Sequence, residues 1–379
     1  MISRITALFV FTGLLLINTP VLAQDYGHEE IHQEEEHVEH NAHAEPNLHG
    51  DHADTHDSQG DDSDIKSVVK ETIEHHLADS YEFHVTEGVS FPLPVILLDD
   101  GLKIFSSSKF DHGHSIAEAN GSYYVMHHNK VYKTDANGSL NFDKHDHPIN
   151  PRPLDFSITK NVFMILVMAV FMVVLFGRMA KSYGPNKTPK KAGRFLEPIV
   201  IYVRDEIAIP NIGEKHYKRY MSYLLTVFFF IWFLNLVGMT PLGINVTGNI
   251  AITFSLALIT FIITQVSGKR DYWMHIFWMP GVPVVLKPVM AVIELIGLFV
   301  KPFSLMIRLY ANMLAGHVVL MSIIGLIFVF GSWLVSPAFF GLTLVLSLLE
   351  LLVAALQAYI FTMLAALYFG SAVEEHDHH

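Results

Sequence analysis

The chain has 379 residues, of which 51% are hydrophobic, and its formal net charge is −12. It is too apolar for an ordinary soluble protein and contains several stretches long enough to cross a bilayer. The absence of cysteine excludes disulfides, thiol catalysis and cysteine-ligated metals. Acidic residues crowd the first third while Lys and Arg gather between Arg178 and Arg219, an asymmetry that indicates membrane topology and not nucleic-acid binding.

Residues 1–23 have the pattern of a bacterial signal peptide. Arg4 precedes an apolar core at residues 5–17, and Val21-Leu-Ala23 forms a small-residue cleavage site before Gln24. This pattern predicts a mature N-terminus outside the cytoplasm. An uncleaved membrane anchor is the alternative.

Residues 24–80 are rich in histidine and acidic residues and nearly devoid of aromatic ones. Such a segment cannot bury a core, so we expect a solvated, mostly disordered tail, in which residues 65–77 could form a short helix. Clustered imidazoles and carboxylates could instead bind zinc or copper or buffer protons, although no fixed ligand spacing recurs.

Residues 81–150 have a composition typical of short strands. Strands are predicted at residues 95–98, 121–126 and 130–133, and Asn120-Gly121 and Asn137-Gly138 are strong turn dipeptides. We therefore expect a small external β-rich element without a catalytic site.

Residues 151–379 form the predicted membrane domain. Spans are expected at residues 158–176, 220–237 and 250–266, and the basic residues 178–194 place the end of the first span in the cytoplasm. Residues 195–212 mix apolar and charged side chains and are predicted to form an interfacial helix, interrupted by Pro198 and Pro210.

Two further apolar stretches, residues 291–330 and 337–368, are longer than a span needs. As helices they would measure roughly 60 and 48 Å against a hydrocarbon core of about 30 Å. A break at Lys301-Pro302 would create a sixth crossing, but no polar turn surrounds it. We therefore predict an all-α membrane protein of about five transmembrane helices, the last two long and strongly tilted, with a cytoplasmic C-terminus and a small β-rich external N-terminal extension.

The first long stretch contains one arginine, Arg308. An arginine at bilayer depth costs about 2.5–3.5 kcal/mol and stays protonated, so its retention points to a use for the charge. Helical spacing places Ser304, Asn312, Ala315 and Gly316 on the same face, which is small and polar and suits close contact with another helix. A snorkelling or internally paired structural arginine is the alternative.

Other polar residues accompany Arg308 in the two long stretches. Glu294 lies toward the arginine face, His317 lies about half a turn away from it, and Glu350 and Gln357 share one face of the last helix. Each of them alone could be a buried polar side chain whose hydrogen bonds are made within the protein. Together with Arg308 and Asn312 they indicate an ion pathway.

The sequence resembles the a subunit of the membrane sector of F-type ATP synthases over residues 156–376. The resemblance rests on the motif Lys301-Pro-x-Ser304-x-x-x-Arg308-Leu-x-x-Asn312-x-x-Ala315-Gly316, on Leu356-Gln-Ala-Tyr-Ile-Phe361 and on Glu374-Glu-His376. Phe233-Leu-Asn235 with Pro241, and Asn249-Ile-Ala-Ile-Thr253, are weaker similarities.

The resemblance implies a non-catalytic stator subunit with two proton half-channels. Arg308 would face the rotating ring of c subunits, with Ser304, Asn312, Gln357 and the small residues Ala315 and Gly316 along that interface. Glu294 would lie near the cytoplasmic half-channel, and His317 and Glu350 in the external one. Several bacterial relatives have an acid and a histidine at those two positions, so here the order is reversed, which leaves open the group that accepts the proton first.

The implied partners are the c ring, b-type peripheral stalk subunits, the rest of the ATP synthase and membrane lipid, with no nucleic acid. We expect no cofactor and no resident metal, a location in the bacterial inner membrane, and a periplasmic N-terminus. A metal-ion transporter fed by the His-rich tail is the alternative, although Arg308 would repel a divalent ion. A membrane anchor without a transport role would leave the buried polar set unexplained, and whether the ion is H⁺ or Na⁺ remains open.

Overall fold

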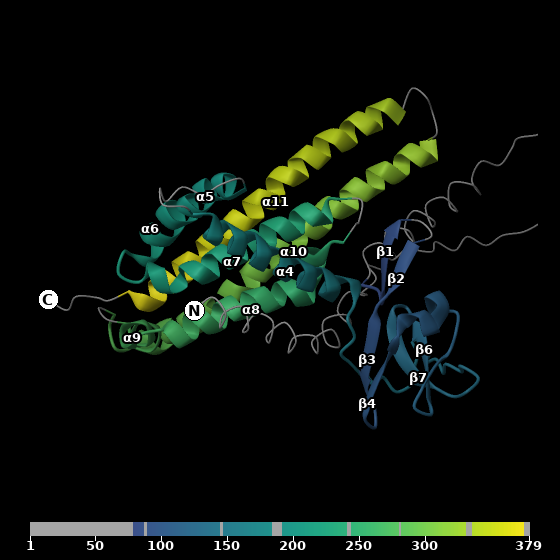
Figure 1. Ribbon diagram of the computed structural model, residues 1–379. Coiled ribbons are helices and arrows are strands. Elements are labelled where there is room, and N and C mark those ends of the chain that lie inside the picture. The colour runs from purple at the N-terminus through teal and green to yellow at the C-terminus, as the bar shows by residue number, and fades with distance from the viewer. Residues whose placement is uncertain are drawn as a thin grey trace, which may run out of the picture.

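The computed structural model describes residues 79–86, 89–144, 147–183, 192–240, 244–279, 282–330 and 336–374. It has two parts, a bundle of long helices and a smaller β-rich part at one end of the bundle (Figure 1). The expected signal peptide, almost all of the expected tail and the expected helix at residues 65–77 lie outside the described residues.

Five helices in the described ranges are long and apolar enough to cross a membrane. They are α4 (Lys160–Ser182), α7 (Tyr217–Gly238), α8 (Ile250–Ser267), α10 (Lys287–Phe330) and α11 (Ser336–Val373). The prediction of five spanning helices is confirmed. Two of them begin where a polar side chain caps the free N–H groups, since Thr159 Oγ1 accepts from Val162 N and Asn249 Oδ1 accepts from Ala251 N.

The last two helices are long, as predicted. α10 has 44 residues and runs through Pro302 without a break, and α11 has 38. At 1.5 Å per residue they measure roughly 66 and 57 Å, so neither fits a hydrocarbon core of about 30 Å unless it lies oblique to the membrane normal. Figure 1 shows the two helices side by side and projecting beyond the other helices.

The core of the bundle surrounds α7, in which Leu224, Phe229 and Ile231 are fully buried. The C-terminal part of α11 packs there through small and aromatic side chains. A Cβ atom on Gly370 would overlap the backbone carbonyl oxygen of Asn211, so α11 approaches the end of the preceding amphipathic segment as closely as glycine permits.

That amphipathic segment is one helical run and not the interrupted helix that the sequence predicts. It comprises α5 (Ala192–Tyr202), the π-helical turn η3 (Val203–Ala208) and α6 (Ile209–Ile212). Pro198 lies inside α5, and Ile209 N–H bonds Arg204 O, five residues back. This wider turn precedes Pro210, whose ring would otherwise press on the carbonyl one turn earlier. Helix α9 (Arg270–Phe277) was not predicted.

In its described residues the β-rich part contains eight short strands. They are β1 (Glu82–Thr86), β2 (Val89–Pro92), β3 (Pro94–Leu98), β4 (Leu102–Ser106), β5 (Ala117–Ala119), β6 (Ser122–His127), β7 (Lys130–Thr134) and β8 (Leu154–Asp155), with the 3₁₀ turn η2 (Ser107–Gly113) after β4. They form the antiparallel sheets β1-β2, β4-β3-β8 and β5-β6-β7. The three predicted strands correspond to β3, β6 and β7, and the other five were missed.

Two tight turns shape the sheet β5-β6-β7. Asn120 and Gly121 have φ angles of 50° and 77°, which confirms the predicted turn between β5 and β6. His128 and Asn129 have φ angles of 46° and 56° and connect β6 to β7 in the same way, without a glycine. This second turn was not predicted.

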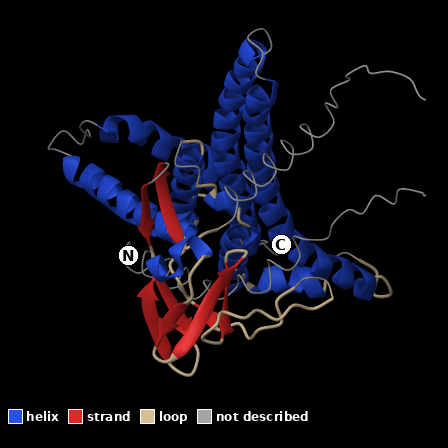
Figure 2. Ribbon diagram, turned by 90° about the vertical axis from the view of Figure 1, so that its right-hand side faces the viewer, coloured by secondary structure: helices blue, strands red, loops and turns tan. Residues whose placement is uncertain are grey.

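The β-rich part is attached directly to the start of α4. Lys160 N–H donates to Ser80 O at 2.9 Å, and Asn161 N–H donates to Asp79 Oδ1 at 3.2 Å. Phe83 of β1 also meets Phe163 of α4 edge to face, with the ring centroids 5.2 Å apart. Viewed from the end that carries the β-rich part, its strands lie in front of the bundle (Figure 2).

Candidate functional site

Arg308 lies at the middle of α10 and is half-buried. Ser304, Asn312 and Ala315, which share its face, are exposed and therefore open to a partner. Gly316 differs from them, because a Cβ at this position would stand 3.4 Å from Glu350 Oε1 of α11. Of the predicted small-residue stripe, Ser304, Asn312 and Ala315 therefore lie on an open face, whereas Gly316 contacts α11.

Tyr368 of α11 lies near two cations of α10. Lys301 Nζ stands 5.8 Å from the centre of its ring, and Arg308 is close enough to interact electrostatically with the tyrosine side chain. Lys301 and Arg308 are two helical turns apart on α10, and the side chain of Tyr368 lies near both of them. Sequence reasoning missed Tyr368, because its proximity to α10 depends on how the two helices pack.

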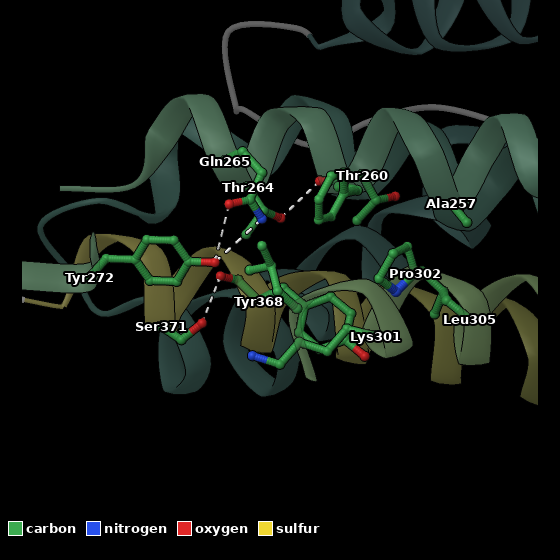
Figure 3. A pocket seen from close by; sticks show the side chains of 12 residues that line it. Ala257, Thr260, Thr264, Gln265, Tyr272, Lys301, Pro302, Leu305, Tyr368 and Ser371 are labelled. Carbon is green, nitrogen blue, oxygen red and sulfur yellow. Dashed lines mark hydrogen bonds between the residues drawn. The ribbon is translucent and has the colours of Figure 1, made fainter. Parts of the chain in front are cut away.

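A small pocket opens beside Lys301, between α8, α9, α10 and α11 (Figure 3). Its polar lining comes from Thr260, Thr264, Gln265, Tyr272, Lys301 and Ser371, and its apolar lining from Ala257, Phe261, Leu298, Pro302, Leu305 and Tyr368. The Tyr272 hydroxyl lies 3.3 and 3.4 Å from the two amide heavy atoms of Gln265. Glu294, half-buried on α10, is near enough to Tyr272 to interact with it electrostatically. This pocket therefore combines neutral hydrogen-bonding groups with one cation and a nearby carboxylate.

The remaining predicted residues, His317, Glu350 and Gln357, are buried, with exposed fractions of 5%, 5% and 4%. Neither carboxyl oxygen of Glu350 has a hydrogen-bond partner among the described residues, so no direct hydrogen bond to His317 is formed. Contact through one water between the two groups stays a prediction.

A second polar group lies near His317, at the junction of α7 and α8. Asn245 Nδ2 donates to the backbone oxygen of Met313 at 3.3 Å, one turn before His317. The Thr247 hydroxyl donates to Asn235 Oδ1 at 2.6 Å, and both side chains are buried. Asn235 was noted only as part of a weak motif similarity, and Asn245 and Thr247 were missed.

The two polar regions lie on opposite sides of Arg308 along α10. The pocket residues of α10 run from Leu298 to Leu305, before Arg308, whereas Met313 and His317 follow it. At 1.5 Å per residue, Lys301 and His317 lie roughly 10 and 14 Å from Arg308 along the helix axis, in opposite directions. The arginine therefore separates the two regions.

The two long helices are the least enclosed part of the bundle. In the most apolar stretches of α10 and α11 only 17% and 11% of residues are buried, against 56% in α7. Two such faces side by side leave a broad apolar surface, in which Ser304, Arg308 and Asn312 are polar. Among the described residues no group of three or more His, Cys, Asp or Glu side chains could hold a metal ion.

Two comparisons relate the chain to known proteins. Residues 161–370 match the family model described as ATP synthase A chain, and residues 72–156 match a domain family of unknown function. The chain is 44% identical to ATP synthase subunit a of Myxococcus xanthus over 60% of its own length and 76% of the relative. It is 36% identical to ATP synthase subunit a of an Anaeromyxobacter species over 84% of its length and 73% of the relative.

Proposed function

This chain belongs to the ATP synthase A chain family, and on that premise we propose that it is the stator subunit that passes protons to and from a rotating ring of c subunits. It performs no nucleotide chemistry itself. The observation that carries the proposal is the position of Arg308, half-buried on an open helix face between two polar regions.

Arg308 would act on the carboxyl group of each ring subunit as it arrives. A guanidinium keeps its charge at any accessible pH and stabilises a nearby carboxylate, so the ring carboxyl would release its proton there. Past the arginine, the carboxylate would regain a proton before it meets lipid, where its charge would be costly. Because each ring carboxyl group loses its proton on one side of Arg308 and regains one on the other, a proton gradient would drive rotation in one direction.

The two polar regions would form the half-channels. The region with His317, Glu350 and the Asn245–Met313 contact would admit protons from outside. The pocket beside Lys301, with Glu294 near Tyr272, would release them to the cytoplasm. Because Arg308 lies between them, protons could pass only by way of the ring.

The orientation follows from the distribution of charge. By the positive-inside rule the basic residues after α4 would lie in the cytoplasm, so the N-terminus and the β-rich part would be periplasmic and the C-terminus cytoplasmic. The subunit would lie in a bacterial inner membrane and contact the c ring through α10 and α11. Peripheral stalk subunits of the b type would hold it against the torque of the ring. No comparison favours the alternative of a metal-ion transporter.

Substitution of Arg308 tests the proposal. Arg308→Ala should abolish proton-driven ATP synthesis in membrane vesicles while immunoblots show normal insertion, and Arg308→Lys should also fail, because a compact ammonium can deprotonate when it is buried. Arg178→Ala, which removes an exposed arginine of α4, is the matched control and should synthesise ATP normally. Coupled synthesis at normal rates in Arg308→Ala would overturn the proposal.

A further inference from the structure

We propose that the open face of the sheet β4-β3-β8 rests on the outer surface of the lipid bilayer and fixes the β-rich part to the membrane beside the helix bundle. The face is apolar. Leu98, Leu102, Ile104 and Leu154 on it are 44, 59, 61 and 53% exposed.

The strand register places these side chains in one contiguous patch. Leu98 is paired with Leu102 on one side and with Leu154 on the other, and Ile104 is paired with Ile96. Directly paired residues in antiparallel strands point to the same face of a sheet, so the patch spans all three strands. It contains no charged side chain.

The opposite face of this sheet is already covered. Val95, Leu97 and Phe105, which alternate with the patch residues, pack with Phe110 and Tyr124 in the core of the β-rich part. In Figure 1 β6 and β7 lie on the far side of β3 and β4 from the helices, which turns the open face toward the side on which the bundle lies. The hairpin β3-β4 extends beyond the edge of the bundle, so helices do not cover its whole length.

Backbone hydrogen bonds hold the sheet close to the start of α4. Phe156 N–H donates to Ile96 O at 2.8 Å and Ile158 N–H donates to Pro94 O at 3.1 Å, so pairing with β3 continues to within two residues of α4. Leu154 lies only six residues before Lys160, where α4 begins. A patch held at the entry of a membrane helix would have hydrocarbon within reach.

Helix α4, which follows β8 in the sequence, also has an apolar surface. Val167, Val170 and Phe171 of this helix are 43, 64 and 48% exposed, as expected of side chains that face lipid. A sheet whose last strand is followed by a lipid-facing helix is well placed to contact the same bilayer. Bilayer contact also explains an apolar face that would otherwise be exposed to water at a cost in free energy.

Single cysteines can test the contact, because the chain has none of its own. Nitroxide labels on Ile104→Cys and, separately, Leu154→Cys would be compared with a label on Glu118→Cys, an exposed position of β5 outside the patch. Each full-length subunit would be reconstituted into phosphatidylcholine vesicles, alone and within the assembled complex. Collision with oxygen, which concentrates in lipid, and with a water-soluble nickel chelate would then be measured.

Lipid contact predicts high oxygen and low nickel accessibility at positions 104 and 154 in both preparations, and the reverse at position 118. Nickel accessibility at both patch positions equal to that at 118 would overturn the proposal. Shielding from both reagents would also overturn it, because it would mean that protein covers the patch. Since two positions are probed, failure of one variant to fold leaves the test intact.

Discussion

Glu350 lies directly over Gly316, with its Oε1 3.4 Å from the point where a Cβ of residue 316 would stand. A methyl group would just make van der Waals contact there, whereas a larger side chain would push the carboxyl group away. Gly316→Ala should therefore retain ATP synthesis and gain up to about 1 kcal/mol of helix stability. Gly316→Val should lower synthesis at an unchanged level of inserted subunit.

Gly177 provides the control for this prediction. It lies in α4 with no atom within 4 Å of its Cβ position, so Gly177→Val imposes the same β-branched residue on a helix without displacing a neighbour. ATP synthesis and immunoblots in membrane vesicles would be compared for all three variants. Normal synthesis in Gly316→Val would show that the position of Glu350 is not critical.

The reversed pair His317 and Glu350 is expected to act as a unit through one bridging water. His317→Glu alone would bring two carboxyl groups together and Glu350→His alone two imidazoles, and each should slow proton entry. The double exchange should recover part of the activity, measured as ATP-driven proton pumping in vesicles. A double variant no better than the worse single one would show that the groups act separately.

Gly370 is predicted to be essential for the packing of α11 on α6. Because its Cβ would overlap the carbonyl oxygen of Asn211, Gly370→Ala should destabilise the subunit by about 1–3 kcal/mol, the range typical of overpacked cores. The expected result is a lower amount of folded subunit, measured by thermal denaturation in detergent. Gly177→Ala is the control and should show no loss.

Asp99 gives a prediction about pH in the β-rich part. The Lys133 ammonium, 2.8 Å from Asp99 Oδ2, and the Tyr124 hydroxyl both hydrogen-bond the carboxylate and lower the pKa of Asp99 below its ordinary value of 3.8. The stabilisation is therefore present above that value and disappears as the pH falls through the lower folded-state pKa.

Asp99→Asn should accordingly destabilise the β-rich part at neutral pH but have little effect in strong acid. Hydrogen exchange of the β3 and β7 amides in the full-length subunit would measure the difference. Asp100→Asn removes a carboxylate that is 90% exposed and 3.6 Å from Lys133, and should change little at any pH. An Asp99→Asn effect that persists unchanged in acid would contradict the assignment.

Hydrophobic length and charge predicted the helices, because a span needs about 20 apolar residues and its ends follow the positive-inside rule. The same signals identified Arg308 and the buried positions of Glu350 and Gln357. They could not place Gly316 against α11 or Tyr368 beside Lys301, because such contacts depend on the crossing of two helices far apart in sequence. The hairpin turn at His128 and Asn129 was missed because it lacks the glycine of the turn dipeptides that were recognised, although Asn and His adopt positive φ angles more readily than most residues.

The uninterrupted course of α10 through Pro302 has a consequence for the pocket. Proline has no N–H, so the carbonyl of Leu298, one turn earlier, lacks its usual helical donor. Both residues line the pocket, so we expect this carbonyl to accept a hydrogen bond from water there. Pro302→Ala would restore the missing donor without altering a titratable group, and slower proton release in that variant would identify main chain as part of the proton path.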